Sequence, residues 1–144
     1  MIVLDTNVLS EAIRLTPSPT VLTWLRVHDR ELYITAVSQA ELLFGLEILP
    51  AGNRRHNLHP QIEALLADVF SDRVLAFDEV AAPLFARIAA SRRKSGRPLD
   101  NLDGQIAAIA LAHRAAVATR NIDDFERCGL TLINPWNPAD SYSN

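Results

Sequence analysis

Residues 1–13, MIVLDTNVLSEAI, place a short apolar run directly before an acid and then a helical pattern. Ile2 to Leu4 is predicted to form a buried strand, Asp5 stands at its end, and a helix is predicted over Thr6 to Ile13. Short apolar strands continue to alternate with helices along the rest of the chain. Strands joined in this way form a mostly parallel sheet with helices on both faces. The sequence therefore predicts an α/β fold, a three-layer α/β/α sandwich around a sheet of four to five strands.

The other elements follow from apolar periodicity and from the prolines and glycines that interrupt it. Further strands are predicted at Leu32–Thr35, Val74–Phe77, Ala116–Thr119 and Leu130–Ile133. Further helices are predicted at Pro19–Asp29, Ser38–Leu49, Gln61–Phe70, Leu102–Arg114 and from Asp78 to Ser95. Ser38 and Glu41 have the spacing of a capping box at a helix start. No internal repeat or linker interrupts the pattern, so residues 1–144 are predicted to form a single domain.

The composition limits the cellular locations and the binding partners that can be expected. A single cysteine, Cys128, cannot form an internal disulfide and fits a reducing cytoplasm. The N-terminus has no basic leader before its apolar run, and no run approaches the ~20 apolar residues of a membrane span. A cytoplasmic protein with no membrane partner is therefore expected. The formal net charge of −3 means that a polyanionic partner must be met by a local basic patch or by bound cations.

Four acids are predicted to meet at one edge of the sheet, although they are far apart in the sequence. Asp5 ends the first strand, and Glu41 lies in the first turn of the helix after the second strand. Asp103 lies in the first turn of its helix, and Asp124 follows the fourth strand within a short turn. Binding sites of open α/β sheets form beyond the carboxyl ends of the strands. We therefore expect Asp5, Glu41, Asp103 and Asp124 to form one acidic site.

An acidic cluster of this kind predicts a bound cation. Two carboxylates ~5 Å apart repel each other by roughly 3 kcal/mol at an effective dielectric constant of ~20. Oxygen ligands without histidine or cysteine suit Mg²⁺ or Mn²⁺ rather than zinc, and such ions promote phosphodiester cleavage by activating water. Simpler roles remain open at this point: helix capping for Glu41, the helix dipole for Asp103, and turn formation for Asp124. Asp123 competes with Asp124 for the role of the fourth acid.

A basic cluster precedes the third acid. It consists of Arg92, Arg93, Lys94 and Arg97, which end one helix and enter the loop before Asp103. Positive charge is favourable at a helix C-terminus in any protein. The alternative interpretation is a basic rim that binds phosphates beside the acids.

Other classes of α/β protein lack the residues that they need here. A phosphatase with an aspartyl nucleophile would carry a second acid at position 7, where this chain has Asn7. A phospho-accepting receiver domain would need a lysine near the last strand, but the only lysine is Lys94. A nucleotide-binding module would need a glycine-rich phosphate loop, which none of the 5 glycines forms. These differences leave a metal-dependent nuclease as the preferred hypothesis.

Five segments together resemble a known family. They are LDTNVLSE (4–11), AVSQAELLFG (36–45), LDGQIAAIALAH (102–113), ATRNIDDF (118–125) and NPW (134–136). In this order they resemble the PIN domain and, more narrowly, the VapC and FitB-like ribonuclease toxins of bacterial toxin–antitoxin operons. The resemblance implies a Mg²⁺- or Mn²⁺-dependent endoribonuclease that a cognate VapB/FitA-like antitoxin inhibits. It also implies that operator DNA is bound only through the antitoxin.

The same resemblance implies a homodimer. The apolar side chains available for packing are numerous for so small a domain, and they include Trp24 and the helical face from Ile62 to Phe70. We expect this helical face to belong either to the core or to a dimer interface. The dimer is expected to bind antitoxin chains in apolar grooves.

The resemblance assigns roles to individual residues. Asp5 is implied to be a metal ligand, and Glu41 and Asp103 complete the main acidic set. Thr6 and Asn7 are implied to order the loop after the first strand.

The last acid of the site differs among members of the family. Some relatives carry it where this chain has Asn121, and others carry it before the phenylalanine, as Asp124 does here. Asn121, Asp123 and Asp124 therefore stay as alternatives, and Thr119 is implied to support this corner of the site. The other functional hypothesis is a catalytically weak or inert PIN-like module that acts mainly through an antitoxin and operator complex.

Overall fold

The computed structural model describes residues 1–139 and 141–143, and it contains a six-stranded sheet with the strand order β3-β2-β1-β4-β5-β6. The strands are β1 (Ile2–Leu4), β2 (Leu32–Thr35), β3 (Val74–Leu75), β4 (Ala116–Ala118), β5 (Thr131–Ile133) and β6 (Ser141–Ser143). Strands β1 to β5 are parallel, and β6 pairs antiparallel with β5. The predicted mostly parallel sheet is confirmed. The sixth strand was not predicted because the residues 141–143, SYS, contain no apolar run.

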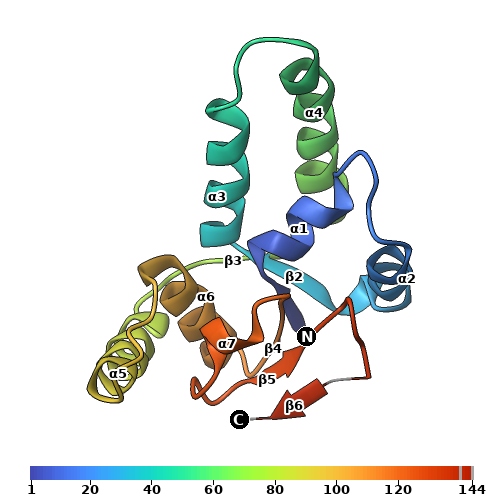
Figure 1. Ribbon diagram of the computed structural model, residues 1–144. Helices are drawn as coiled ribbons and strands as arrows, with labels where there is room; N and C mark the ends of the chain where they lie inside the picture. The colour runs from blue at the N-terminus through green and yellow to red at the C-terminus, as the bar shows by residue number, and fades with distance from the viewer. Residues whose placement is uncertain (140, 144) are drawn as a thin grey trace.

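Helices cover both faces of the sheet (Figure 1). They are α1 (Thr6–Ala12), α2 (Pro19–Val27), α3 (Ala36–Glu47), α4 (Asn53–Ala64), α5 (Ala81–Lys94), α6 (Asn101–Ala112) and α7 (Ile122–Phe125), with a 3₁₀ turn η1 (Asp29–Glu31) and a π-helical turn η2 (Leu65–Val69). No helix within the described residues is long and apolar enough to span a membrane.

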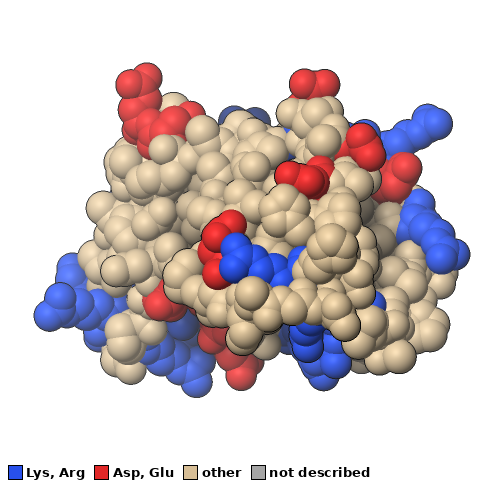
Figure 2. All heavy atoms as spheres, turned by 90° about the horizontal axis from the view of Figure 1, so that it is seen from above, with Lys and Arg blue, Asp and Glu red and all other residues tan. Residues whose placement is uncertain are grey.

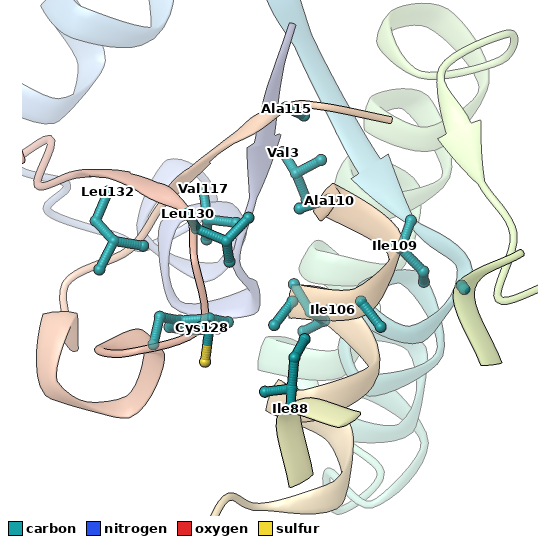
Figure 3. Packing of buried hydrophobic residues seen from close by; sticks show 14 of the residues in the cluster. Val3, Ile88, Ile106, Ile109, Ala110, Ala115, Val117, Cys128, Leu130 and Leu132 are labelled. Carbon is teal, nitrogen blue, oxygen red and sulfur yellow. The ribbon is translucent and has the colours of Figure 1, made fainter. Parts of the chain in front are cut away.

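Alternation along the strands sends side chains into two separate cores. Val3, Val117 and Leu132 pack with α5 and α6, as Figure 3 shows for residues such as Ile88 and Ile106. The neighbouring strand residues, among them Leu4, face α1, α2 and η2 on the other side. This is the period of two expected of strands that are buried on both faces. The predicted three-layer α/β/α fold is therefore confirmed.

The start of α3 differs from the prediction. The cap is Thr35, whose Oγ1 accepts a hydrogen bond from the Ser38 backbone N–H at 2.9 Å, so the helix begins at Ala36. The predicted capping box of Ser38 and Glu41 is therefore wrong. Glu41 lies in the second turn of α3, and its carboxylate is not used at the helix start.

Helix α4 also begins earlier than predicted, at Asn53 rather than Gln61, and it continues through Pro60. Residues 53–60, NRRHNLHP, contain one leucine and no amphipathic period, so the exposed first turns gave no sequence signal. Helices α3 and α4 form a hairpin that projects beyond the sheet (Figure 1). Its small core contains Leu42, Leu46 and Ile62.

Of the apolar residues considered for a dimer interface, Val69 is 43% exposed and the others are buried or partly buried. Trp24 is buried, as are Ile62 and Phe70, so they stabilise the single chain. The outer side of α3 instead exposes Phe44 at 65% and Ile48 at 63%. Phe44 and Ile48, which the sequence did not single out, are therefore more exposed than the residues considered for an interface.

Candidate active site

Asp5 lies at the end of β1 and caps α1. Its backbone N–H donates to the Ala118 carbonyl at 2.9 Å, which continues the pairing of β1 with β4. Its Oδ1 accepts from the Thr6 backbone N–H at 2.7 Å. Its Oδ2 accepts from Asn7 Nδ2 at 2.7 Å and from Thr119 Oγ1 at 2.8 Å. Three donors therefore fix a carboxylate that is only 6% exposed.

The loop after β4 supplies one of these donors and is itself held by hydrogen bonds. The Thr119 N–H donates to the Ile133 carbonyl at 2.9 Å, and Thr119 Oγ1 accepts from the Asn121 N–H at 3.0 Å. Asn7 joins the two loops, since its amide N–H donates to Asp5 and its Oδ1 accepts from the Arg120 N–H at 3.2 Å. The loops after β1 and β4 therefore form one hydrogen-bonded unit around Asp5.

Glu41 approaches this unit from α3. Thr6 Oγ1 donates to Glu41 Oε2 at 2.6 Å, which is the short distance expected of a hydroxyl bound to a carboxylate. The first turn of α3 is tied to the sheet, because the buried Ser38 hydroxyl contacts Thr35 Oγ1 at 3.0 Å and donates to the Leu4 carbonyl at 3.4 Å. These contacts fix the side of α3 that carries Glu41 next to the end of β1.

Asp103 lies in the first turn of α6, where Asp100 is the N-cap residue. Burial raises the pKa of Asp103 from 3.8 to about 7, and the negative charges of Asp5, Asp124, Asp100 and Glu41 add to this shift. The carboxylates of four separate segments therefore act on one another, as the sequence predicted from the ends of the strands.

The pKa of Asp5 is also raised. Burial is the largest cause, the hydrogen bonds from Thr119 and Thr6 oppose it, and the charges of Glu41 and Asp124 add to it. Asp124 is thus among the charges that act on both Asp5 and Asp103. Asp123, although it is adjacent in the sequence, is not among the largest contributions to either shift. This difference favours Asp124 as the fourth acid.

A polar cavity of about 450 Å³ opens beside the turn that carries Asp124. It is lined by Arg120, Asn121, Ile122, Asp123, Asp124 and Asn134. Asn121, which was considered as a ligand, contributes its backbone N–H to Thr119 and its carbonyl to the Asp124 N–H at 3.1 Å. The cavity therefore joins the loop that orients Asp5 to the turn that carries Asp124.

Comparison with known proteins decides the family. The family model described as the PIN domain matches residues 2–129. The chain belongs to the PIN domain family. The VapC ribonuclease Y4jK of Sinorhizobium fredii is 44% identical over 140 residues, which cover 96% of this chain and 100% of that protein.

Two further comparisons concern one relative. Toxin FitB of Neisseria gonorrhoeae is 36% identical over 138 residues, covering 95% of this chain and 99% of that protein. The solved structure of FitAB bound to an IR36 DNA fragment superposes with a TM-score of 0.88 at 36% identity, covering 94% of this chain and 96% of that chain. The relatives thus match nearly the whole of this PIN domain protein.

The chemistry of this PIN domain site suits a hard cation, although the ligands do not form a closed shell. Within residues 1–139 and 141–143, no three His, Cys, Asp or Glu side chains are close enough together to hold an ion as they stand. The donors that converge are all carboxylates, which are the ligands that Mg²⁺ and Mn²⁺ prefer. The raised pKa of Asp103 shows that full ionisation of the cluster is unfavourable without added positive charge. The residues therefore fit a cation that draws them together.

The prediction that Arg92 belongs to a basic rim is wrong. Arg92 is 5% exposed, and its Nε donates to the Arg97 carbonyl at 2.8 Å. Its Nη1 donates to the Asp123 carbonyl at 3.4 Å and to the Glu126 carbonyl. Helix charge patterning could not reveal that this one arginine points inward. Arg92 therefore joins the end of α5 to α7 and is closed to a polyanion.

The other three members of the basic cluster are exposed. Arg97 pairs with Glu126 at 3.1 Å, and Arg93 and Lys94 lie on the last turn of α5. Viewed from above, Lys and Arg side chains gather mainly near the margins of the molecule (Figure 2). RNA binding by these three residues stays a prediction.

The sequence analysis did not consider Arg120 or Trp136. The Arg120 guanidinium carbon lies 5.2 Å from the centroid of the Trp136 ring, and Arg120 lines the polar cavity. Both residues lie inside quoted motifs, ATRNIDDF and NPW. Arg120 could have been identified from its position between Thr119 and Asn121, which the resemblance assigns to the site.

Proposed function

We propose that this PIN domain protein is a divalent-metal-dependent endoribonuclease and the toxin of a toxin–antitoxin pair. The observation that carries the proposal is the convergence of four acids from β1, α3, α6 and α7 at one edge of the sheet. The 44% identity to a VapC ribonuclease and the 36% identity to toxin FitB support the choice of RNA and the toxin role.

In this proposal Asp5, Glu41 and Asp103 hold Mg²⁺ or Mn²⁺, and Asp124 completes the site. The bound ion would supply an activated water and positive charge for the phosphate oxygens. Asn7 and Thr119 keep the Asp5 carboxylate directed toward the neighbouring acids through their bonds at 2.7 and 2.8 Å.

The hydrogen-bonded residues around the acids have the role of positioning. Thr6 directs Glu41 through its hydroxyl, and Asn121 closes the turn before Asp124. Because these contacts exist without a ligand, the Asp5 carboxylate is already oriented, although the other acids would have to move closer to it to enclose an ion. Preorganisation of this kind lowers the cost of binding.

The proposed antitoxin site is the apolar cavity of about 390 Å³ between α1, α2 and η2, whose lining includes Leu9, Leu25 and Val69. An amphipathic antitoxin segment has the chemistry to fill it. With a net charge of −3, this protein would reach operator DNA only through the antitoxin. A homodimer through the exposed face of α3 and a cytoplasmic location complete the proposal.

Cleavage by the purified protein, free of antitoxin, tests the proposal. An RNA labelled separately at each end should be cut internally with Mg²⁺ or Mn²⁺ and stay intact in EDTA. Asp5→Asn should abolish cleavage, whereas the matched control Asp72→Asn, at an exposed position before β3, should retain it.

The alternative of a catalytically inert module predicts no cleavage with either metal, combined with normal antitoxin binding. Cleavage at full rate in excess chelator, by a sample of demonstrated purity, would contradict the metal-dependent mechanism. Equal cleavage by wild type and Asp5→Asn would show that the activity belongs to a contaminant.

A further inference from the structure

Arg120 is carried on the same hydrogen-bonded loop that orients Asp5. Its N–H donates to Asn7 Oδ1 at 3.2 Å. The residue before it, Thr119, is bound through its N–H to Ile133, and the residue after it, Asn121, is bound to the Thr119 hydroxyl. The backbone of Arg120 is therefore fixed relative to the acidic cluster, although its side chain is exposed.

The side chain of Arg120 lies over an aromatic ring. Its guanidinium carbon is 5.2 Å from the Trp136 centroid, within the range of a cation–π contact. Trp136 packs against the core on the α1 and α2 side of the sheet, and its backbone N–H donates to Asn134 Oδ1 at 3.0 Å. A ring on one face of a guanidinium leaves the N–H groups in its plane free for an anion.

The charge of Arg120 is not used in an ion pair among the described residues. The charge of Arg120 contributes to the lowered pKa of the buried Glu11. The two carboxylate oxygens of Glu11, however, already accept from the Ser18 N–H at 2.7 Å and from Arg14 Nη1 at 3.0 Å. Arg120 is therefore a preorganised cation that pairs with no carboxylate in the part of the chain that the structure describes.

Arg120 shares its cavity with the proposed fourth acid. The cavity of about 450 Å³ is lined by Arg120, by the two acids Asp123 and Asp124, and by Asn121, Ile122 and Asn134. A strand whose scissile phosphate lies at the acids would place an adjoining phosphate in this cavity. In a chain with a net charge of −3, one fixed cation beside the carboxylates would contribute much of the attraction for RNA.

We propose that Arg120, held against Trp136, binds an RNA phosphate next to the one that is cleaved. The inference rests on the proposed ribonuclease function and adds a subsite to it. The planar guanidinium offers paired N–H donors that match two phosphate oxygens, which a lysine cannot reproduce. Trp136 restricts the guanidinium, so less conformational freedom is lost when the phosphate binds.

The test uses Arg120→Gln and the charge-matched control Arg30→Gln. Arg30 is exposed on η1, immediately before β2, at the opposite edge of the sheet from the acids. Binding of a fluorescein-labelled, single-stranded oligoribonucleotide is followed by anisotropy in EDTA at several salt concentrations. Steady-state cleavage with Mn²⁺ is measured in parallel.

For Arg120→Gln we expect Kd and KM to rise about tenfold with kcat nearly unchanged, because the contact is made in the bound complex and at the transition state alike. The slope of log affinity against log salt should fall by about 0.7, the value for one phosphate contact on a single strand. Arg120→Lys should keep the slope and recover part of the affinity. Arg30→Gln should change neither quantity.

Two results would overturn the inference while leaving the ribonuclease function intact. One is wild-type affinity and salt slope in Arg120→Gln. The other is a lower melting temperature for Arg120→Gln with unchanged RNA binding, which would make the contact with Trp136 purely structural. A wild-type protein that neither binds nor cleaves RNA would instead refute the proposed function and the inference together. If Arg120→Gln does not fold, Arg120→Lys and Trp136→Leu supply the same comparison, and wild-type KM in both would refute the subsite.

Discussion

Asp103→Asn separates a role in the acidic site from a role in helix geometry. The substitution removes one negative charge and keeps nearly the same shape in the first turn of α6. Asp103 is only partly exposed, and the charge of Asp5 is the strongest of those that act on it after burial. In the absence of metal, we therefore expect Asp103→Asn to be more stable than the wild type at neutral pH.

The magnitude follows from the pKa of Asp103, which rises from 3.8 to about 7 on folding. A shift of this size corresponds to at most about 4 kcal/mol at pH 7. Solvent screening around a partly exposed side chain reduces the expected gain to ~1–3 kcal/mol. For a domain of this size each kcal/mol raises Tm by about 4 °C.

The sign of the pH dependence is determined by the raised pKa. The folded protein binds the Asp103 proton more tightly than the unfolded chain, so wild-type stability falls as pH rises from about 4 to about 7. Below this window Asp103 is protonated in both states and carries no penalty. The advantage of Asp103→Asn should therefore be near zero at pH 4, grow toward pH 7 and stay constant above it.

Thermal melting across this pH range measures the effect, first in EDTA and then in millimolar Mn²⁺. A bound ion stabilises the wild type by about 2.7 kcal/mol at a hundredfold excess over Kd. Metal should therefore narrow or reverse the difference in Tm between the two proteins. Asp123→Asn is the control, since Asp123 is exposed and is not among the largest contributions to the pKa shift of Asp103. A catalytically active Asp103→Asn protein, with a Tm difference from the wild type that changes with neither pH nor metal, would refute the reasoning.

Three further predictions concern the loop, the buried arginine and assembly. Thr119→Val removes the hydroxyl that donates to Asp5 at 2.8 Å, so the pKa of Asp5 should rise. The free energy of unfolding should fall by about 1–3 kcal/mol, and Mn²⁺ binding measured by calorimetry should weaken. Unchanged Mn²⁺ affinity would show that Thr119 does not contribute to the metal site. Arg92→Met removes a buried side chain that donates to the Arg97, Asp123 and Glu126 carbonyls, and it should cost about 2–4 kcal/mol in urea unfolding. The exposed neighbour Arg93→Met should cost less than about 0.5 kcal/mol. Equal costs would contradict the structural role of Arg92. Phe44→Glu should convert a wild-type dimer into a monomer in light scattering, and a wild type that is monomeric at all micromolar concentrations would contradict the proposed interface.

The sheet and the convergence of the acids could be predicted because both depend on short-range patterns. The run before Asp5 is entirely apolar, and an acid after a buried parallel strand must lie at the carboxyl edge. Once the strands were correctly assigned, parallel pairing brought Asp5 and Asp124 to the same edge without further information. The errors in the helix boundaries left this result unchanged.

The remaining features depend on contacts that no local pattern encodes. Thr35 and Ser38 are both acceptable helix caps, and the choice between them follows from the buried bond of Ser38 to the Leu4 carbonyl. Arg92 and Arg93 are adjacent and chemically identical, but successive side chains point in different directions around a helix, and on α5 only that of Arg92 faces α7. The cation–π contact of Arg120 with Trp136 needs β5 beside β4, which is a property of the folded sheet.

Direct titration of the purified, antitoxin-free protein with Mn²⁺ at pH 7 tests the central claim that the acids form a cation site. Isothermal calorimetry in buffers of different ionisation enthalpy reports both the affinity and the protons that are released. We predict saturable binding with proton release, because the ion displaces the proton that Asp103 holds with a pKa of about 7. Asp5→Asn should lose this binding, and Asp123→Asn should keep it. Absence of saturable binding in the wild type, or equal binding by Asp5→Asn, would contradict the account.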